Sequence, residues 1–201
     1  PFSTIGMPPQ DLKYKGEKTL LRVGRGNTFR EYVNVSTGSV DGNLETVIGD
    51  QNLFMCYVHV AHDCVIGSHT ILANTATLAG HITIGDHAVI GGLAAIHQFV
   101  HIGAHAMVGG GAMVAQDVPP YVTAVGDRAK PAGVNSRGIS RRGFSPGAIA
   151  AIKTAYRYVY REKLTLHDAL ARIEAELVPL HPELAVFVSF CRDSTRGIIR
   201  D

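Results

Sequence analysis

Histidines recur through the middle of this sequence at intervals close to eighteen residues. The first group is His62, His81 and His97, with His59 a little upstream. Asp63 follows His62 directly, and a histidine beside a carboxylate is the usual general base of an enzyme. Three histidines could instead hold a zinc ion. The group therefore has two chemical interpretations, a proton-transfer site or a metal site.

A second group of histidines is spaced by eighteen residues at each step. His69, His87 and His105 occupy the same place in three similar segments, IGSHT, IGDHA and IGAHA. Segments of this kind are typical of turns, and turn side chains usually face solvent. The pattern predicts surface histidines without a chemical role.

A large apolar residue returns at every sixth position through the region that carries both groups. The twelve positions are Ile48, Phe54, Val60, Ile66, Leu72, Leu78, Ile84, Ile90, Ile96, Ile102, Val108 and Val114. The residue after each is nearly always glycine or alanine, which would let the chain turn a corner. A period of six matches neither a helix nor an ordinary hairpin sheet, and it is typical of a hexapeptide β-helix. The repeat predicts a triangular prism of stacked coils, three hexads to a coil, with the large residues and Cys64 inside it.

Stacking of the coils places residues eighteen positions apart one above the other, separated by about 4.8 Å. His62, His81 and His97 then fall within one position of each other and line one corner over three coils. Gly80 falls directly above His62. Adjacent strand residues point to opposite faces, so Asp63 reaches His62 only if the backbone bends there.

The change of period divides the chain into two parts. Residues 1–135 are expected to form the β-helix, with inserted loops at about 7–18 and 37–45. Residues 136–201 are expected to form a connection and a small α-helical domain. Because the first residues already resemble a hexad, further coils are expected before Pro1.

The C-terminal part is predicted to be helical after an irregular connection. Residues 121–135 carry glycine and proline and lose the repeat, so no regular element is predicted there. Ser145 is a good N-cap for a first helix, with Pro146 at its first position. Apolar residues at helical spacing predict two further helices, over 165–177 and 182–192.

Size and composition exclude several classes of protein. The chain has 201 residues, of which 46% are hydrophobic and 18% are charged, and its net charge is +2. This charge is too small to indicate a nucleic-acid-binding protein, and no apolar run approaches the roughly 18 residues of a membrane span. Three cysteines without a CxxC pair are typical of reduced thiols in a cytoplasmic protein.

Eight segments carry a more specific signal than the repeat. They are GMPPQDLKYKGE (6–17), HVAHDC (59–64), LAGHITIGD (78–86), IHQF (96–99), QDVPPYV (116–122), PAGVN (131–135), RRGFS (141–145) and STRG (194–197). Together they resemble the acyl-ACP–UDP-N-acetylglucosamine O-acyltransferase family, which carries out the first step of lipid A biosynthesis. The resemblance covers almost the whole chain.

The resemblance implies a left-handed parallel β-helix that forms a homotrimer, with active sites in the clefts between subunits. The implied reaction moves a 3-hydroxyacyl chain from acyl carrier protein to the 3-hydroxyl of UDP-N-acetylglucosamine. No cofactor or metal is implied, because the phosphopantetheine arm of acyl carrier protein delivers the acyl group. Acyl carrier protein is acidic, so a basic C-terminal surface would favour its docking; the candidates are Arg137, Lys153, Arg157 and Arg161.

The resemblance also implies a role for each matching residue. His62 would be the general base, Asp63 would orient or polarise it, and the Gly80 backbone N–H would stabilise the oxyanion. The residues implied to line the sugar and diphosphate site are Asp11, Lys13, His59, His81, His97 and Gln98.

Further matching positions concern the nucleotide and the acyl chain. Asn135, Arg141 and Arg142 would reach the nucleotide, since the fork of an arginine suits phosphate oxygens. Arg137 stands where other members carry an acidic residue, so the nucleotide contacts are expected to differ. Gly110 matches the position that limits acyl length in the family, and a glycine there predicts a longer chain.

Three alternatives stay open on the sequence alone. An N-acyltransferase of the same family, acting on a UDP-3-amino sugar, would use the same residues. A gamma-type zinc carbonic anhydrase would need a pair of histidines spaced H-x4-H, which the group His62, His81 and His97 lacks. A non-catalytic scaffold from a truncated gene would keep the repeat without the chemistry.

Overall fold

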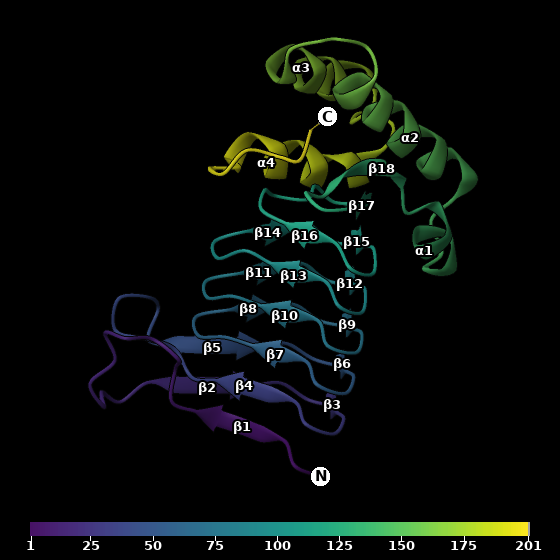
Figure 1. Ribbon diagram of the computed structural model, residues 1–201. Coiled ribbons are helices and arrows are strands. Elements are labelled where there is room, and N and C mark those ends of the chain that lie inside the picture. Colours follow the sequence, from purple (N-terminus) through teal and green to yellow (C-terminus); the bar gives the residue numbers. More distant parts are fainter. Residues whose placement is uncertain (201) are drawn as a thin grey trace.

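The computed structural model describes residues 1–200, which form a stack of triangular coils with helices at one end (Figure 1). Successive strands alternate between three sheets. The first sheet contains β1 (Thr4–Met7), β4 (Asn34–Ser36), β7 (His59–Val60), β10 (Thr77–Leu78), β13 (Ala95–Ile96) and β16 (Met113–Val114). The second contains β2 (Leu20–Val23), β5 (Glu45–Ile48), β8 (Val65–Ile66), β11 (Thr83–Ile84) and β14 (His101–Ile102). The third contains β3 (Thr28–Phe29), β6 (Leu53–Phe54), β9 (Ile71–Leu72), β12 (Val89–Ile90), β15 (Met107–Val108), β17 (Val122–Val125) and β18 (Lys130–Val134).

The inside of the prism is filled by the residues that repeat every six positions. All twelve, from Ile48 to Val114, are at most 2% exposed. Each coil pairs with the next in the expected register; Leu78, for example, lies between Val60 and Ile96. Burial of one such side chain contributes about 1.5–3 kcal/mol, and Cys64 is fully buried among them. The predicted hexapeptide β-helix is therefore confirmed.

Each corner of the prism turns through a residue with positive φ, three positions after the inward apolar residue. At the corner between β7 and β8 and its successors, these residues are Asp63 (φ 58°), His81 (φ 61°) and Phe99 (φ 64°). Such residues seldom adopt this conformation, and the repeated turn imposes it. The glycine directly after the apolar residue has another task, since a Cβ on Gly85 would collide with Ala104 of the next coil. The expectation that the small residues make the corner was thus incomplete, because they mainly let the coils stack.

Two loops interrupt the eighteen-residue register near the N-terminus. Ile5 pairs with Val35, thirty positions on, and Val23 pairs with Ile48, twenty-five positions on. Both loops project from the same side of the prism (Figure 1). The extra residues lie in the two segments predicted as insertions, 7–18 and 37–45.

The connection after the last regular coil is more ordered than predicted. Residues 122–134 form the antiparallel pair β17–β18, which extends the third sheet. A short helix, α1 (Ser136–Arg141), follows it. The prediction of an irregular segment over 121–135 was wrong, because β17 pairs with β15 and continues that sheet although the six-residue repeat has ended.

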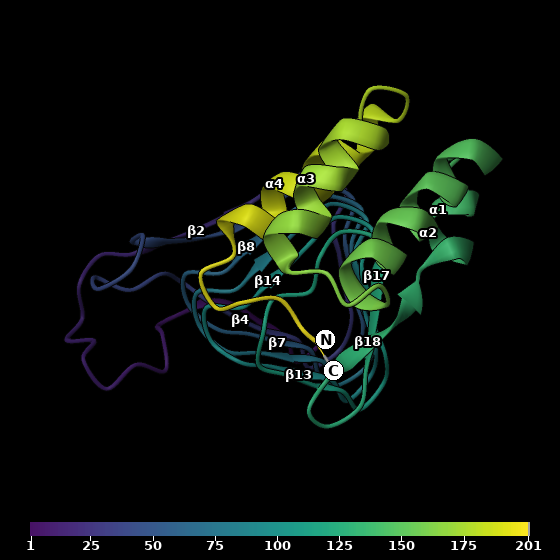
Figure 2. The same ribbon diagram turned by 90° about the horizontal axis from the view of Figure 1, so that it is seen from above.

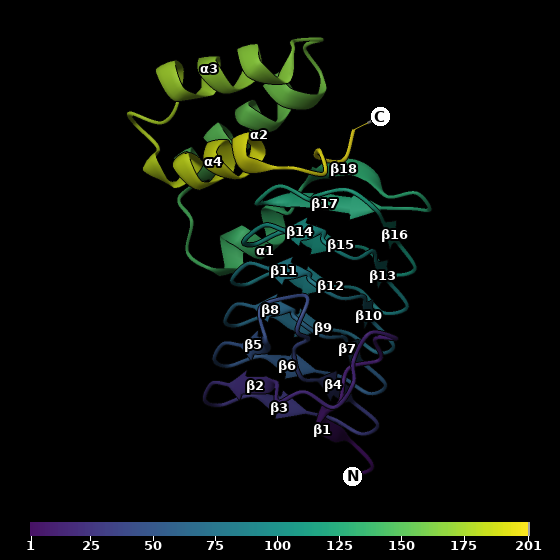
Figure 3. The same cartoon turned by 90° about the vertical axis from the view of Figure 1, so that its left-hand side faces the viewer.

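The remaining helices cover the C-terminal end of the prism (Figures 2 and 3). They are α2 (Pro146–Tyr160), α3 (Leu166–Glu176), the 3-10 turn η1 (Pro182–Leu184) and α4 (Ala185–Asp193). Ser145 caps α2 as predicted, and Thr165 caps α3. The helix predicted over 182–192 is divided into η1 and α4. Among residues 1–200, no helix has the length and apolar character that crossing a membrane requires.

Candidate active site

His62 and Asp63 form a close pair at the corner between β7 and β8. The Asp63 carboxylate lies 2.7 Å from Nδ1 of His62. The backbone bend that this contact requires is present, since Asp63 has a φ of 58°. An ionised carboxylate can only accept, so Nδ1 carries the proton and Nε2 is left as a free acceptor. This is the arrangement of a histidine poised to take a proton.

The Asp63 carboxylate is buried and is held by the second loop. Its side chain has no exposed surface. It accepts hydrogen bonds from the Ser39 hydroxyl at 2.7 Å, the Ser39 N–H at 3.1 Å and the Asn43 N–H at 2.9 Å. Burial alone would raise the pKa of Asp63, but the bonds from Ser39, His62 and Asn43 hold it below its ordinary value. Asp63 is therefore ionised at neutral pH.

Gly80 lies directly above the His62 ring, as the eighteen-residue register predicted. A Cβ on Gly80 would lie 2.7 Å from Cε1 and 2.8 Å from Nε2 of the imidazole. Within residues 1–200, no acceptor is bonded to the Gly80 N–H. A glycine at this position thus leaves open space and a free donor next to the nitrogen that would take the proton.

His81 completes this corner. Its ring meets His62 edge to face with centroids 5.1 Å apart, and it stacks on Phe99 at 4.5 Å. Its Nε2 lies 3.8 Å from Oδ2 of Asp63. Burial lowers the pKa of His81, an effect that Asp63 opposes. His81 is therefore a neutral donor or acceptor beside the His62–Asp63 pair.

The other residues predicted near this corner are placed less closely. His97 is one coil further and is exposed, and its Nδ1 lies 3.1 Å from the backbone oxygen of its neighbour Gln98. Of the three histidines predicted to line this corner, the structure therefore brings His62 and His81 into contact and leaves His97 apart. His59 lies on β7, where Nδ1 is 2.8 Å from the side chain of Asn34 and burial lowers its pKa.

The first loop contributes Asp11 and Lys13. Lys13 forms a salt bridge of 2.7 Å with Asp41 of the second loop, and this contact raises the pKa of Lys13. Asp11 accepts from the Lys13 N–H at 3.0 Å, and its charge, like that of Asp63, opposes the lowering of the His81 pKa by burial. Both residues therefore lie on the His62 side of the prism.

The residues predicted to reach the nucleotide lie at a different corner. Asn135, Arg141 and Arg142 line a cavity of about 300 Å³ together with His87 and His105. The side-chain amide of Asn135 is engaged, because it donates to the His105 carbonyl at 2.9 Å and caps α1 through the Gly138 N–H. The two arginines are exposed at the rim.

Two members of the second histidine column, His87 and His105, line this cavity. His69, His87 and His105 stack as nearly parallel rings with centroids 4.8 and 4.7 Å apart. The pKa of His105 is lowered to about 4, mainly by burial and further by His87 and Arg142. Phe144 packs edge-on against His105 at 5.1 Å. The expectation of solvent-facing histidines was wrong for His87 and His105, because the chain after β18 folds back over them.

Gly110 lies at the third corner of the prism, apart from the corner of His62 and the corner of His87. It is exposed, and a Cβ built on it would lie 3.3 Å from the carbonyl oxygen of Gly92. Within one chain, the residues implied for base catalysis, nucleotide binding and acyl length are therefore spread over three corners.

Comparison with known proteins agrees with the resemblance seen in the sequence. The profile of the family described as UDP N-acetylglucosamine O-acyltransferase, domain 2, matches residues 117–199, and that of bacterial transferase hexapeptide (six repeats) matches residues 45–80. The acyl-[acyl-carrier-protein]–UDP-N-acetylglucosamine O-acyltransferase of Thermodesulfovibrio yellowstonii is 54% identical over 200 residues, which is 100% of this chain and 77% of that protein. The chain belongs to the acyl-ACP–UDP-N-acetylglucosamine O-acyltransferase family.

A further relative and a solved structure agree with this assignment. The protein of the same description from Janthinobacterium is 49% identical over 99% of this chain and 77% of its own length. The solved structure of LpxA from Acinetobacter baumannii superposes with a TM-score of 0.96 at 41% identity, over 99% of this chain and 77% of that chain. The coil stack is therefore the left-handed parallel β-helix of this acyltransferase family.

The possible metal ligands of this chain do not suit a metal ion. Within residues 1–200, one group of possible ligands comes together, formed by His62, Asp63 and His81. Oδ2 of Asp63 already accepts from the Ser39 hydroxyl and from His62, and Oδ1 accepts from Asn43. A cation would have to displace these bonds, so the pair fits proton transfer better than zinc.

Sequence reasoning missed the residues that hold the pair in place. Ser39 and Asn43 fall in the segment recognised as an insertion, but the sequence gives no sign that the loop folds back onto Asp63. The stacking of His87 under the chain after β18 was missed for the same reason. Both contacts join segments more than eighteen residues apart, outside the periodic register.

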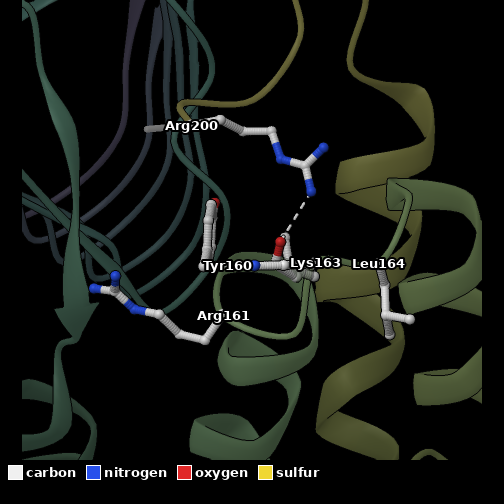
Figure 4. Close-up of a pocket in the computed structure, with 6 residues that line it drawn as sticks. Tyr160, Arg161, Lys163, Leu164 and Arg200 are labelled. Atoms are coloured by element: carbon white, nitrogen blue, oxygen red, sulfur yellow. Dashed lines mark hydrogen bonds between the residues drawn. The ribbon is translucent and has the colours of Figure 1, made fainter.

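A second cavity, of about 530 Å³, lies among the C-terminal helices, apart from the two histidine columns of the prism. It is lined by Val159, Tyr160, Arg161, Lys163, Leu164 and Arg200 (Figure 4). Arg200 donates to the Val159 carbonyl at 2.9 Å and closes one side of it. Three of the six lining residues are cations, so the cavity favours an acidic partner.

Proposed function

We propose that this chain transfers a 3-hydroxyacyl group from acyl carrier protein to the 3-hydroxyl of UDP-N-acetylglucosamine, the first step of lipid A biosynthesis. The observation that carries the proposal is the His62–Asp63 pair with the free N–H of Gly80 beside it. The substrates named for the relatives above support the same assignment.

His62 acts as the general base in this mechanism. Its Nε2 takes the proton from the sugar hydroxyl while that oxygen attacks the thioester carbon. Asp63 holds the correct tautomer and stabilises the imidazolium that forms. When the carbon–sulfur bond breaks, the imidazolium returns the proton to the departing thiolate of the phosphopantetheine arm.

Gly80 supplies the oxyanion donor. Negative charge develops on the thioester oxygen in the tetrahedral intermediate, and a preorganised N–H directed at it is worth roughly 3–4 kcal/mol. Because a side chain on Gly80 would strike the imidazole, the glycine also keeps the space in which the thioester must lie. His59, His81, His97, Gln98, Asp11 and Lys13 are proposed to hold the sugar and diphosphate.

The active site is proposed to lie between subunits of a homotrimer. The pair at one corner and Arg141–Arg142 at another cannot reach one substrate within a single chain. A neighbouring copy that presents its second corner to the first would bring Arg141, Arg142 and Asn135 to the nucleotide. Gly110 at the third corner is proposed to leave room for a long acyl chain.

Acyl carrier protein is proposed to dock on the helical end. Arg137, Lys153 and the three cations of the second cavity, Arg161 among them, are exposed there, and they complement an acidic partner. Arg157 is partly neutralised by Glu162, 2.9 Å away. A cytoplasmic location is supported by three free thiols that form no disulfide.

A direct test offers two acceptors to the purified protein. Radiolabelled 3-hydroxyacyl-ACP is supplied with UDP-N-acetylglucosamine or with its 3-amino analogue, and the esters and amides formed are counted. Transfer to the hydroxyl sugar is expected to dominate. A strong preference for the amine, or no transfer to either acceptor, would overturn the assignment. The mass of the active species in solution checks the trimer.

A further inference from the structure

Ser39 is a buried polar residue that the mechanism above does not use. It lies in the second loop and is 1% exposed. Its hydroxyl donates to Oδ2 of Asp63 at 2.7 Å, and its N–H lies 3.1 Å from both carboxylate oxygens. Every hydrogen bond that Ser39 donates is therefore directed at one carboxylate, while its carbonyl accepts from the Gly42 and Leu44 N–H groups within the second loop.

The loop around Ser39 is shaped to this carboxylate. A Cβ on Gly42 would collide with the carboxylate of Asp63, and the Asn43 N–H donates to Oδ1 at 2.9 Å. On the other side, Thr46 fixes the backbone, since its hydroxyl accepts from the Asp63 N–H at 2.9 Å. Asp63 is therefore held by Ser39, Asn43 and Thr46 in addition to His62.

Ser39 and His62 share one oxygen of Asp63. Oδ2 accepts the Ser39 hydroxyl and the His62 Nδ1–H at the same distance, 2.7 Å. A donor that stabilises an anion reduces the pull of that anion on its other partner. The Ser39 hydroxyl therefore limits how strongly Asp63 favours the imidazolium form of His62.

We propose that Ser39 is a positioning residue that tunes the basicity of His62 through Asp63. The proposal rests on the proposed function, in which His62 must be neutral to take a proton and charged to return it. The titratable groups that face His62 are Asp63 and His81, and Asp11 acts on His81 from the first loop. Of these groups, Asp63 alone is bonded to the Ser39 hydroxyl.

The first measurement uses the resting protein and needs no activity. The ring protons of His62 are followed by NMR as a function of pH in the wild type and in Ser39→Ala. Loss of the hydroxyl leaves Oδ2 to His62 alone, so the titration midpoint is expected to rise by about half a pH unit. An unchanged midpoint would overturn the proposal. A lowered midpoint would overturn it too, because it would show that the carboxylate had left His62 and that the hydroxyl is only a tether.

The second measurement is the pH profile of kcat. In Ser39→Ala, the acid limb is expected to move to higher pH by the same amount, so that kcat falls about threefold at low pH and little at high pH. KM for the sugar nucleotide should stay unchanged. A uniform loss of kcat at all pH values would assign Ser39 a structural role only. Ser39→Thr keeps the hydroxyl and should restore the wild-type limb, and Ser39→Cys, a weaker donor of similar size, should give a smaller shift in the same direction.

Thr70 offers a matched control. It is buried, and its N–H and hydroxyl both donate to Oδ1 of Asn52 at 2.7 Å, much as Ser39 donates to Asp63. Thr70→Val removes the same kind of bond where no histidine shares the acceptor, so neither the midpoint nor the acid limb should move. The two proposals fail separately: an absent acyl transfer activity leaves the NMR test intact, and an unmoved midpoint in an active enzyme rejects only the role of Ser39.

Discussion

Two corners of one prism carry histidine columns of nearly the same spacing, yet they differ in their partners. At the first corner, His62 faces a buried carboxylate held by the second loop. At the second, His87 and His105 stack on each other beside Arg142, and the pKa of both is lowered first by burial and then by neighbouring groups that include Arg142. An imidazole beside an anion can accept and stabilise a proton, whereas one beside a cation resists it. The repeat supplies the position of a histidine, and the loops that cover each corner decide what it does.

The largest effect is expected from removing one histidine of each column. His62→Ala removes the general base, so kcat should fall about 1,000-fold. His87→Ala removes a side chain from the cavity that Asn135 and Arg142 also line, so a rise in KM for the sugar nucleotide is expected, with kcat retained. Steady-state assays with acyl-ACP separate the two parameters. Equal losses of kcat in both variants would break the distinction between the corners.

The aspartates of the two corners allow the next comparison. Asp63→Asn places an amide beside His62, and its N–H₂ group can hold the imidazole in the tautomer with the proton on Nε2. A decrease in kcat of about 100-fold is expected, because that nitrogen can no longer accept. Asp86, which precedes His87, is exposed, and its carboxylate accepts the Ser68 N–H at 2.7 Å. Asp86→Asn should therefore change kcat less than twofold, and a large loss there would contradict the comparison.

The sequence predicts the first corner well and the second poorly, for a physical reason. The eighteen-residue register is a property of the coil, so the position of Gly80 above His62 follows from counting. The alternation of side chains along a strand also predicts that Asp63 reaches His62 only through a backbone bend, and the positive φ of Asp63 provides that bend. The cradle of Ser39 and Asn43 comes from an insertion, and the cover of His105 comes from the chain after β18. Neither follows the repeat, so neither could be counted.

The histidines of the second corner should make the free energy of unfolding depend on pH. His105 has a pKa of about 4 in the folded protein against 6.5 for a free histidine, because it is buried beside His87 and Arg142. The unfolded chain binds this proton more readily, so the free energy of unfolding decreases as pH falls from about 6.5 to 4. Allowing for partial solvent screening, the loss is about 1–2 kcal/mol.

Denaturant unfolding at pH 7 and pH 4.5 measures this loss. His105→Gln cannot take up the proton, so its stability should vary less between the two pH values than that of the wild type. His101 is exposed and serves as the control position; His101→Gln should keep the full pH dependence. If the stability of His105→Gln depended on pH as strongly as that of the wild type, protonation of His105 would not be the cause of the loss.

The smallest effect is expected where the two loops meet beside the first corner. Lys13 and Asp41 form a salt bridge of 2.7 Å, but both side chains are more than half exposed, and exposed ion pairs contribute little to stability. Lys13→Met should therefore shift the melting temperature by less than about 2 °C. If Lys13 also contacts the diphosphate, KM for the sugar nucleotide should rise in this variant and stay near the wild-type value in Asp41→Asn, which frees the same lysine. Equal rises in both variants would mean that the salt bridge, and not the cation, is what the substrate requires, and the loop would then belong with the cradle of Asp63 as part of the scaffold of the first corner.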